Sequence, residues 1–227
     1  MKKLIIVAGL MAAATVLVQA QNREVRNVGS FDEVKVGESV RLVLVPGNKN
    51  EVLVETDGVE VDKVETSVSG GQLRIGMSRG TWRSFTVTVT VTFKELNGVK
   101  CSSSARVNSK GTIDSNDFYV DVSSSGRVNL DVNVEKLKVE VSSSGRIELS
   151  GSATTQVVQA SSSGRYSAFG LDSEGVKVDV SSSGRVEVNV SKEIYADASS
   201  SGRVSYKGSP EKVIADTSSS GKISRAQ

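Results

Sequence analysis

The chain has 227 residues, with 28 Lys and Arg against 26 Asp and Glu, one Cys, no His, and few aromatic residues: five Phe, four Tyr and one Trp. Without His, the chain cannot build the catalytic dyads and triads that use imidazole, or the commonest zinc sites. A single Cys rules out an internal disulfide, so the packing of the core must stabilise the fold.

Residues 1–20 have the pattern of a signal peptide. Lys2 and Lys3 precede an apolar run over residues 4–18, and the small residue Ala20 ends the segment. The run is too short for a comfortable membrane span. We therefore expect an exported protein with no membrane span, located in the periplasm, at the cell surface or outside the cell. Removing Lys2 and Lys3 from the 28 cationic residues leaves 26, which balance the 26 acidic ones. The charge therefore gives no indication of nucleic-acid binding.

Residues 21–100 contain short segments of alternating polarity, which predict β-strands. The clearest is residues 85–93, where threonine alternates with valine between two phenylalanines. Pro46-Gly47 and Gly70-Gly71 have the composition of turns. No linker separates this N-terminal β region from the rest, so we expect residues 21–227 to form one continuous domain.

Residues 101–227 repeat a Ser-Ser-Ser-Gly-Arg motif seven times, with Ala105 replacing Gly in the first copy. Successive Ala/Gly positions are 21, 19, 19, 20, 18 and 19 residues apart. Apolar and polar residues alternate on both sides of each motif, as in half-buried strands. Each unit therefore predicts a strand, a tight serine turn, a second strand and a looser second turn. The turn glycines are Gly126, Gly145, Gly164, Gly184, Gly202 and Gly221.

This organisation predicts an all-β protein, a single-stranded parallel β-helix (solenoid) with two sheets and about 19 residues per rung. Equivalent residues of successive rungs would then stack about 4.8 Å apart. Long helices are not expected, because valine dominates the apolar residues. The middle Ser of each triplet shares the parity of the inward valines, so we expect it to point into the corner and hydrogen-bond there.

The layout resembles the GIN-domain family of auto-transporter adhesin heads, found in gut and environmental Bacteroidetes. The resemblance rests on Phe31-x-x-Val34-x-Val36-Gly37, on Gly71-Gln72-Leu73-Arg74-Ile75 and on the strand at Val87–Phe93, and it covers nearly all of the chain after residue 20. It implies a pectin-lyase-like superhelix, a role in adhesion and no catalytic residues. The family's turns carry Gly-Ser-Gly, whereas this chain keeps only the last Gly. We therefore expect a positive φ at that final Gly and not at the first turn position, with Ala105 as the exceptional corner.

The cation that follows each turn is the main candidate for a binding residue. Stacked cations about 4.8 Å apart repel one another by roughly 0.9 kcal/mol per pair even in water. A basic ridge of this kind could bind a polyanion such as an acidic polysaccharide. Alternatively, each guanidinium pairs with an acid such as Glu148 or Glu187 and its stem covers apolar surface. The candidate residues are Arg106, Arg127, Arg146, Arg165, Arg185, Arg203 and Lys222.

Three isolated features have weaker indications. Trp82 could stack on a sugar or plug the open end of the solenoid. Asp131-x-Asn133-x-Glu135 offers oxygen atoms for Ca²⁺, but the pattern is not repeated and also fits a solvated strand. Cys101 falls in the inward column, which predicts a buried thiol. We predict no catalytic residue, no metal site and no cofactor.

Together, these patterns predict an exported, non-enzymatic adhesin that presents repeated columns to a glycan, to the cell envelope or to a host surface protein. The alternative is a structural or assembly protein of the envelope, because solenoid ends expose strand edges that favour trimeric or end-to-end association. A polysaccharide-degrading enzyme fits less well, since such enzymes need clustered carboxylates and aromatic subsites in long loops.

Overall fold

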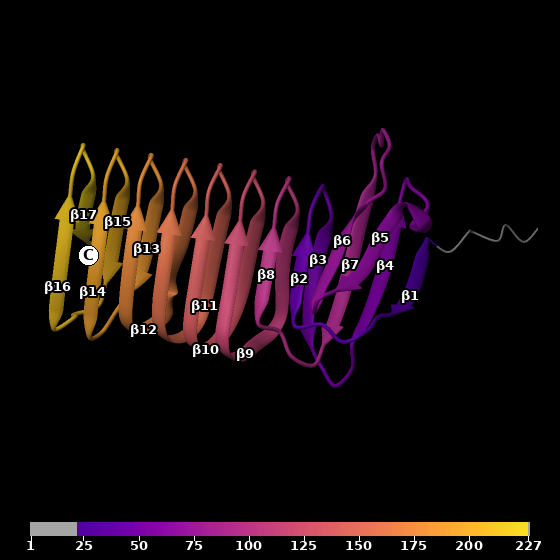
Figure 1. Ribbon diagram of the computed structural model, residues 1–227, viewed down its shortest axis with the longest axis horizontal. Helices are drawn as coiled ribbons and strands as arrows, with labels where there is room; N and C mark the ends of the chain where they lie inside the picture. Colours follow the sequence, from indigo (N-terminus) through magenta and orange to yellow (C-terminus); the bar gives the residue numbers. More distant parts are fainter. Residues whose placement is uncertain (1–21, 227) are drawn as a thin grey trace, which may run out of the picture.

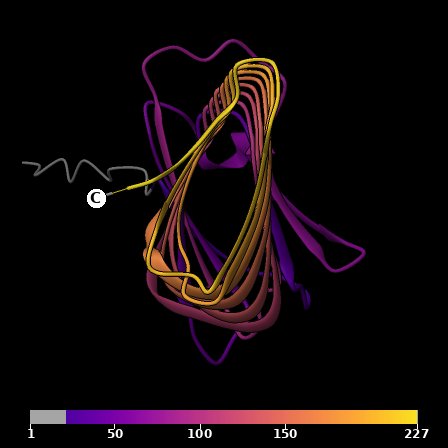
Figure 2. The same ribbon diagram turned by 90° about the vertical axis from the view of Figure 1, so that its left-hand side faces the viewer.

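The computed structural model describes residues 22–226, which form an elongated β-solenoid (Figure 1). Successive rungs follow one another along the long axis, and a view along that axis shows a flattened outline with the serine turns stacked at its narrow corner (Figure 2). Within the described residues, the one helical element is a 3-10 turn at Val61–Lys63. The predicted all-β solenoid is thus confirmed. The expected signal peptide lies outside the described residues.

The repeat region builds its rungs from long strands. Four strands each run from one serine turn to the next: β9 (Arg106–Val122), β10 (Arg127–Val141), β11 (Arg146–Ala160) and β12 (Arg165–Val180). The following rungs divide into shorter strands: β13 (Arg185–Asn189), β14 (Glu193–Ala198), β15 (Arg203–Lys207), β16 (Lys212–Thr217) and β17 (Lys222–Arg225). The looser second turn expected from the sequence is therefore, in four rungs, a bend inside a continuous strand. In β11, Gly151 with φ 104° makes this bend while it stays paired with Val132.

Neighbouring rungs pair in parallel, and equivalent positions of the repeat lie side by side. Arg127, for example, is in register with Arg106 on one side and with Arg146 on the other. Where rungs differ in length, the register shifts only near the looser second turn, at the opposite end of the rung from the serine turns, as between Glu148 and Ser150. The serine corner therefore keeps chemically equal residues in straight columns.

The N-terminal strands extend both sheets, but not all in one direction. One sheet continues through β3 (Arg41–Pro46), β7 (Thr86–Phe93), β4 (Glu51–Asp57) and β1 (Arg23–Asn27); the other continues through β8 (Gly98–Cys101), β2 (Glu33–Val36), β6 (Gln72–Met77) and β5 (Val64–Ser69). The pairs β1–β4, β4–β7 and β5–β6 are antiparallel, unlike the wholly parallel helix expected from the sequence. The β5–β6 connection is the two-residue turn Gly70-Gly71, with φ values of 57° and 77°, which joins only antiparallel strands.

The interior between the two sheets is filled by columns of branched aliphatic side chains. Val120, Val139 and Val158 stack in one such column and are fully buried. Cys101 lies in the inward position expected for it and is 2% exposed. Burial raises the pKa of its thiol to about 11, so the side chain acts as a small apolar residue.

A short polar chain interrupts the apolar interior. The Tyr166 hydroxyl donates to Oε1 of Gln156 at 2.7 Å, and Nε2 of Gln156 donates to the Ser173 hydroxyl at 2.5 Å. All three side chains are buried. Each of these hydrogen bonds replaces a hydrogen bond to water that the buried side chains have lost.

Replacing Tyr166 with Phe is expected to lower the free energy of unfolding by about 1–3 kcal/mol, because Oε1 of Gln156 stays buried without its donor. Chemical denaturation followed by circular dichroism measures the change. The matched control is Tyr206→Phe, since Tyr206 is only half-buried and the described residues include no hydrogen-bond partner for its hydroxyl. Equal losses in both variants would contradict this role for the buried chain.

The serine turns differ from the expectation in where the positive φ lies. In all seven copies, the second and third serines have positive φ, 46–52° and 65–72°, and the glycine does not. The glycine is required for another reason: a Cβ on Gly164 would lie 2.6 Å from the carbonyl oxygen of Val141 on the preceding rung. The assignment of positive φ to the glycines was therefore wrong. Ala105 follows a turn with the same φ values and is fully buried.

The middle serines also point elsewhere than expected. Their side chains are exposed in every copy, not turned into the corner. The alternation of inward and outward residues holds only along an extended strand, and two residues of positive φ break it. The backbone connects the corners instead, as where the Ser125 amide donates to the Ser143 carbonyl of the next rung at 3.2 Å.

Candidate functional site

The cations that follow the serine turns form one straight column. It lies on the outer face of the sheet that contains β3, β7, β4 and β1, which we call the first sheet. Strand β3 adds Arg41, which is in register with Arg106, so the column has eight members and all of them are exposed. Arg41 was not predicted from the sequence, because its turn, Gly37–Val40, lacks the serine triplet. The sequence pattern that could have predicted Arg41 is a short turn that contains Gly and is followed directly by Arg. We call Arg41, Arg106, Arg127, Arg146, Arg165, Arg185, Arg203 and Lys222 the basic column.

The cations of the basic column form no ion pair or side-chain hydrogen bond with the described part of the chain. Within residues 22–226, none of them lies within 4.0 Å of an acidic group or donates a side-chain hydrogen bond. Glu187 instead accepts a hydrogen bond from the Ser167 hydroxyl at 2.9 Å. The alternative in which Glu148 and Glu187 neutralise the arginines was therefore wrong. Each rung presents an unneutralised cation to solvent.

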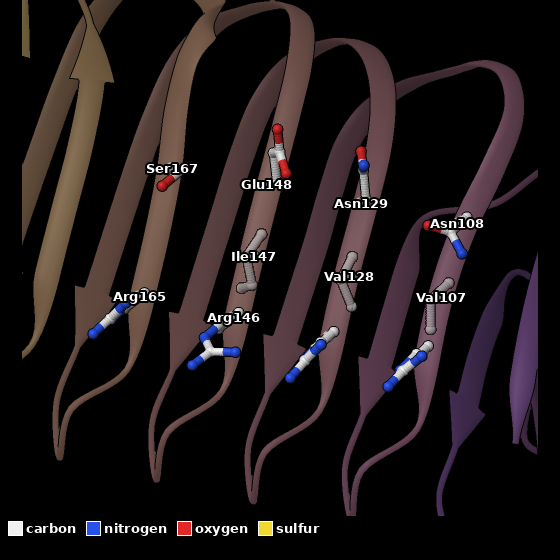
Figure 3. Close-up of a pocket in the computed structure, with 11 residues that line it drawn as sticks. Val107, Asn108, Val128, Asn129, Arg146, Ile147, Glu148, Arg165 and Ser167 are labelled. Atoms are coloured by element: carbon white, nitrogen blue, oxygen red, sulfur yellow. The ribbon is translucent and has the colours of Figure 1, made fainter. Parts of the chain in front are cut away.

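A shallow groove of about 370 Å³ runs beside the basic column. One wall is formed by the arginines, and the other by the residues two positions further along each strand, namely Asn108, Asn129, Glu148 and Ser167. Figure 3 shows Arg146 and Arg165 side by side on neighbouring strands, with the second wall beyond them. Three of the four rungs thus offer a guanidinium with an amide or a hydroxyl beside it. Such a pattern suits an extended anionic chain that also carries hydroxyl groups.

Trp82 lies in the loop between β6 and β7, away from the groove. Its Nε1 donates to the Ser78 carbonyl at 3.3 Å, and its ring lies so close to Gly80 that a Cβ there would come within 2.7 Å of it. The ring is half-buried against its own loop and is not among the side chains packed on the core. Trp82 therefore does not plug the solenoid, and its stacking on a sugar stays a prediction.

On the second sheet, which contains β8, β2, β6 and β5, the outer column beside the serine corner is largely acidic. Its column of matching positions consists of Asp121, Glu140, Gln159, Asp179, Asp197 and Asp216. Burial and the neighbouring Glu140 raise the pKa of Asp121, whereas a hydrogen bond from Lys138 lowers the pKa of Glu140. A basic column and a largely acidic column thus flank the serine corner, and the next outer column of the second sheet carries Lys138 and Lys177.

The candidate calcium ligands take part in hydrogen bonds between rungs. The Ser150 hydroxyl donates to Asp131 at 3.1 Å, and Nδ2 of Asn133 donates to Asp114 at 2.8 Å. Among the described residues, no group of three or more acidic, Cys or His side chains is placed to hold a metal ion. These polar side chains align neighbouring rungs at the second corner.

The chain was compared with known protein families and with solved structures. Residues 30–210 match the family described as "Putative auto-transporter adhesin, head GIN domain". The chain belongs to this family. The predicted resemblance to the GIN-domain family is thus confirmed, and membership among auto-transporter adhesin heads implies export. In the described part of this GIN-domain protein, no helix has the length and apolarity needed to cross a membrane.

Solved structures share the fold of this GIN-domain protein at low sequence identity. A putative adhesin from Bacteroides fragilis has a TM-score of 0.80 at 19% identity, over 90% of this chain and 96% of that one. A structure described as a putative lipid binding protein from Parabacteroides distasonis has a TM-score of 0.70 at 22% identity, over 92% and 98%. A putative adhesin from Parabacteroides merdae has a TM-score of 0.66 at 17% identity, over 90% and 95%. No curated protein matches the chain.

Proposed function

We propose that this protein is an exported, non-enzymatic adhesin module of the periplasm or cell surface that binds a linear acidic polysaccharide along its basic column. The observation that carries the proposal is the run of eight exposed cations, in register and without ion pairs among residues 22–226. Membership in a family of adhesin heads supports the binding role. The lack of His in the sequence supports a module without catalysis.

The stacking of like charges favours a ligand with repeated negative charge. Cations on adjacent rungs repel one another, and an anion placed between two of them removes that repulsion. A guanidinium binds a carboxylate through two parallel hydrogen bonds, which suits uronate residues. Since each exposed pair contributes little alone, useful affinity arises from many contacts made by one chain.

Replacing Arg127, Arg146 and Arg165 with Gln is expected to weaken the binding of polygalacturonate by about tenfold or more, because three adjacent charge contacts are lost. Binding to the immobilised polymer at low and moderate salt measures the effect, with dextran as the neutral polymer. Binding of the unmodified protein should also weaken as salt rises.

The matched control removes the same charge from the outer face of the second sheet, through Lys136, Lys138 and Lys177 replaced with Gln. This variant should bind polygalacturonate nearly as well as the unmodified protein. If the two triple variants lose equal affinity, or if dextran binds as tightly as polygalacturonate, the basic column is not the binding site.

A second candidate function is assembly of the protein with itself. The acidic column repeats with the same rung spacing as the basic column, so the acidic column of one copy is complementary to the basic column of another. Light scattering over a range of protein and salt concentrations tests this idea. A mass that rises at low salt and falls when the arginines are replaced favours assembly, whereas a constant monomer mass overturns it.

A further inference from the structure

A second cavity lies at the N-terminal end of the basic column and shares Arg106 with the groove described above. It has a volume of about 230 Å³. Its walls are Ser39, Arg41, Phe85, Thr86, Ser104 and Arg106. We call it the end pocket.

The end pocket exists because the stack of serine turns stops here. Arg41 follows the turn at residues 37–40, and its register partner on β7 is Thr88. The next rung would place another turn beside residues 37–40, but β7 is entered from the long loop after β6. Phe85, the last residue of that loop, therefore lies beside the turn. The Phe85 side chain is half-buried and packs against the core, which holds the ring in place.

The pocket combines charge with an apolar surface. Arg41 and Arg106 stand on adjacent strands, are exposed, and have no ion pair within residues 22–226. A carboxylate between them would accept hydrogen bonds from both guanidiniums. The Phe85 ring offers the apolar face on which the C–H groups of a pyranose pack, and the exposed hydroxyls of Ser39 and Ser104 can bond to sugar hydroxyls.

The groove further along the column lacks this combination, since no aromatic side chain lines it. A carboxylate alone would not need Phe85, and a neutral sugar would not need two cations. A sugar that carries its own carboxylate uses the two cations, the aromatic ring and the serine hydroxyls of the end pocket.

We propose that the end pocket binds one hexuronic acid residue, the terminal unit of the acidic polysaccharide, and thereby fixes where the polymer begins along the basic column. This inference rests on the proposed function. The column supplies many similar contacts and would allow the polymer to slide from rung to rung. The end pocket supplies a single distinct position.

The test uses galacturonate as a monosaccharide, with galactose and acetate as the two partial ligands, titrated into the protein and followed by NMR. Arg41→Gln is expected to weaken galacturonate binding by about tenfold, as the loss of one charge-assisted contact implies. Phe85→Leu keeps the apolar contact with the core and should weaken binding several-fold. Lys177→Gln, an exposed cation on the outer face of the second sheet and outside the basic column, should leave monosaccharide binding unchanged.

The outcomes separate the two proposals. If Arg41→Gln and Lys177→Gln weaken galacturonate binding equally, or if acetate or galactose binds as tightly as galacturonate, the end pocket proposal is overturned while the basic column stands. If sulfated galactose binds more tightly than galacturonate through Arg41, the carboxylate assignment is overturned. If replacing the arginines of the basic column leaves polygalacturonate binding unchanged, the proposed function fails, and the inference fails with it.

Discussion

The variant Gly164→Val is expected to lower the free energy of unfolding by about 3 kcal/mol. A Cβ on Gly164 would lie 2.6 Å from the carbonyl oxygen of Val141 and 2.8 Å from its carbonyl carbon. Both atoms belong to the backbone of the preceding rung, so no side chain can rotate away to make room. Valine must therefore push two rungs apart at the corner where their backbones are hydrogen-bonded. Thermal unfolding followed by circular dichroism measures the loss.

The matched control is Gly170→Val in β12, the strand that follows the turn containing Gly164. A Cβ there meets the Cβ of Ser150 at 3.6 Å and two backbone atoms of Leu149 and Ser150 at 3.9 Å, all ordinary contact distances, and neither glycine has a positive φ. The control should be neutral or slightly stabilising, since an exposed strand position favours valine over glycine. Similar losses at Gly164 and Gly170 would show that the close approach of rungs does not decide the residue at the turn.

The opposite effect is expected when the strained serines of three neighbouring turns are replaced. Asn-Gly in place of Ser143-Ser144, Ser162-Ser163 and Ser182-Ser183 should raise the free energy of unfolding by about 1 kcal/mol per turn, or about 3 kcal/mol in total. Two positive φ values in succession make a type I′ turn, for which Asn-Gly is the favoured sequence. A residue with a Cβ is less stable there, because its Cβ crowds the following carbonyl oxygen. Urea denaturation of the variant measures the gain.

The control for this gain is glycine at the first serine of one triplet, Ser161→Gly. Ser161 does not have a positive φ, so glycine relieves no strain there and only adds freedom to the unfolded chain. We expect a loss of about 0.5–1 kcal/mol. If the Asn-Gly variant is no more stable than the unmodified protein, the exposed serines contribute to stability in a way that the backbone angles do not reveal.

The repeat made the regular part of the fold predictable. A two-residue alternation locates the inward side chains, which is why Val139 and Cys101 are buried as expected. A repeat of about 19 residues also fixes the stacking of equal positions, and thereby the basic column. Strand alternation does not encode strand direction, so the antiparallel pairs of β4 and β5 could not be predicted.

The geometry of the turns was less predictable, because two physical effects compete for the same glycine. Local propensity favours glycine wherever φ is positive, and this predicted the wrong residues. The actual reason, contact with the carbonyl of the preceding rung, depends on a neighbour 23 positions away in the chain, as with Gly164 and Val141. Arg41 and Phe85 were missed for a related reason. Both lie outside the repeat and reach the column only through the pairing of β3 with β7 and β9.

The matching register of the serine corner gives the molecule the properties of a ruler. Differences in rung length are accommodated near the looser second turn, as at the register shift between Glu148 and Ser150, so the cations of the basic column stay in register. Insertion or deletion of one whole rung would lengthen or shorten the basic column by a single cation and leave the other cations in register. Chains with different numbers of rungs would then measure different lengths of the same polymer.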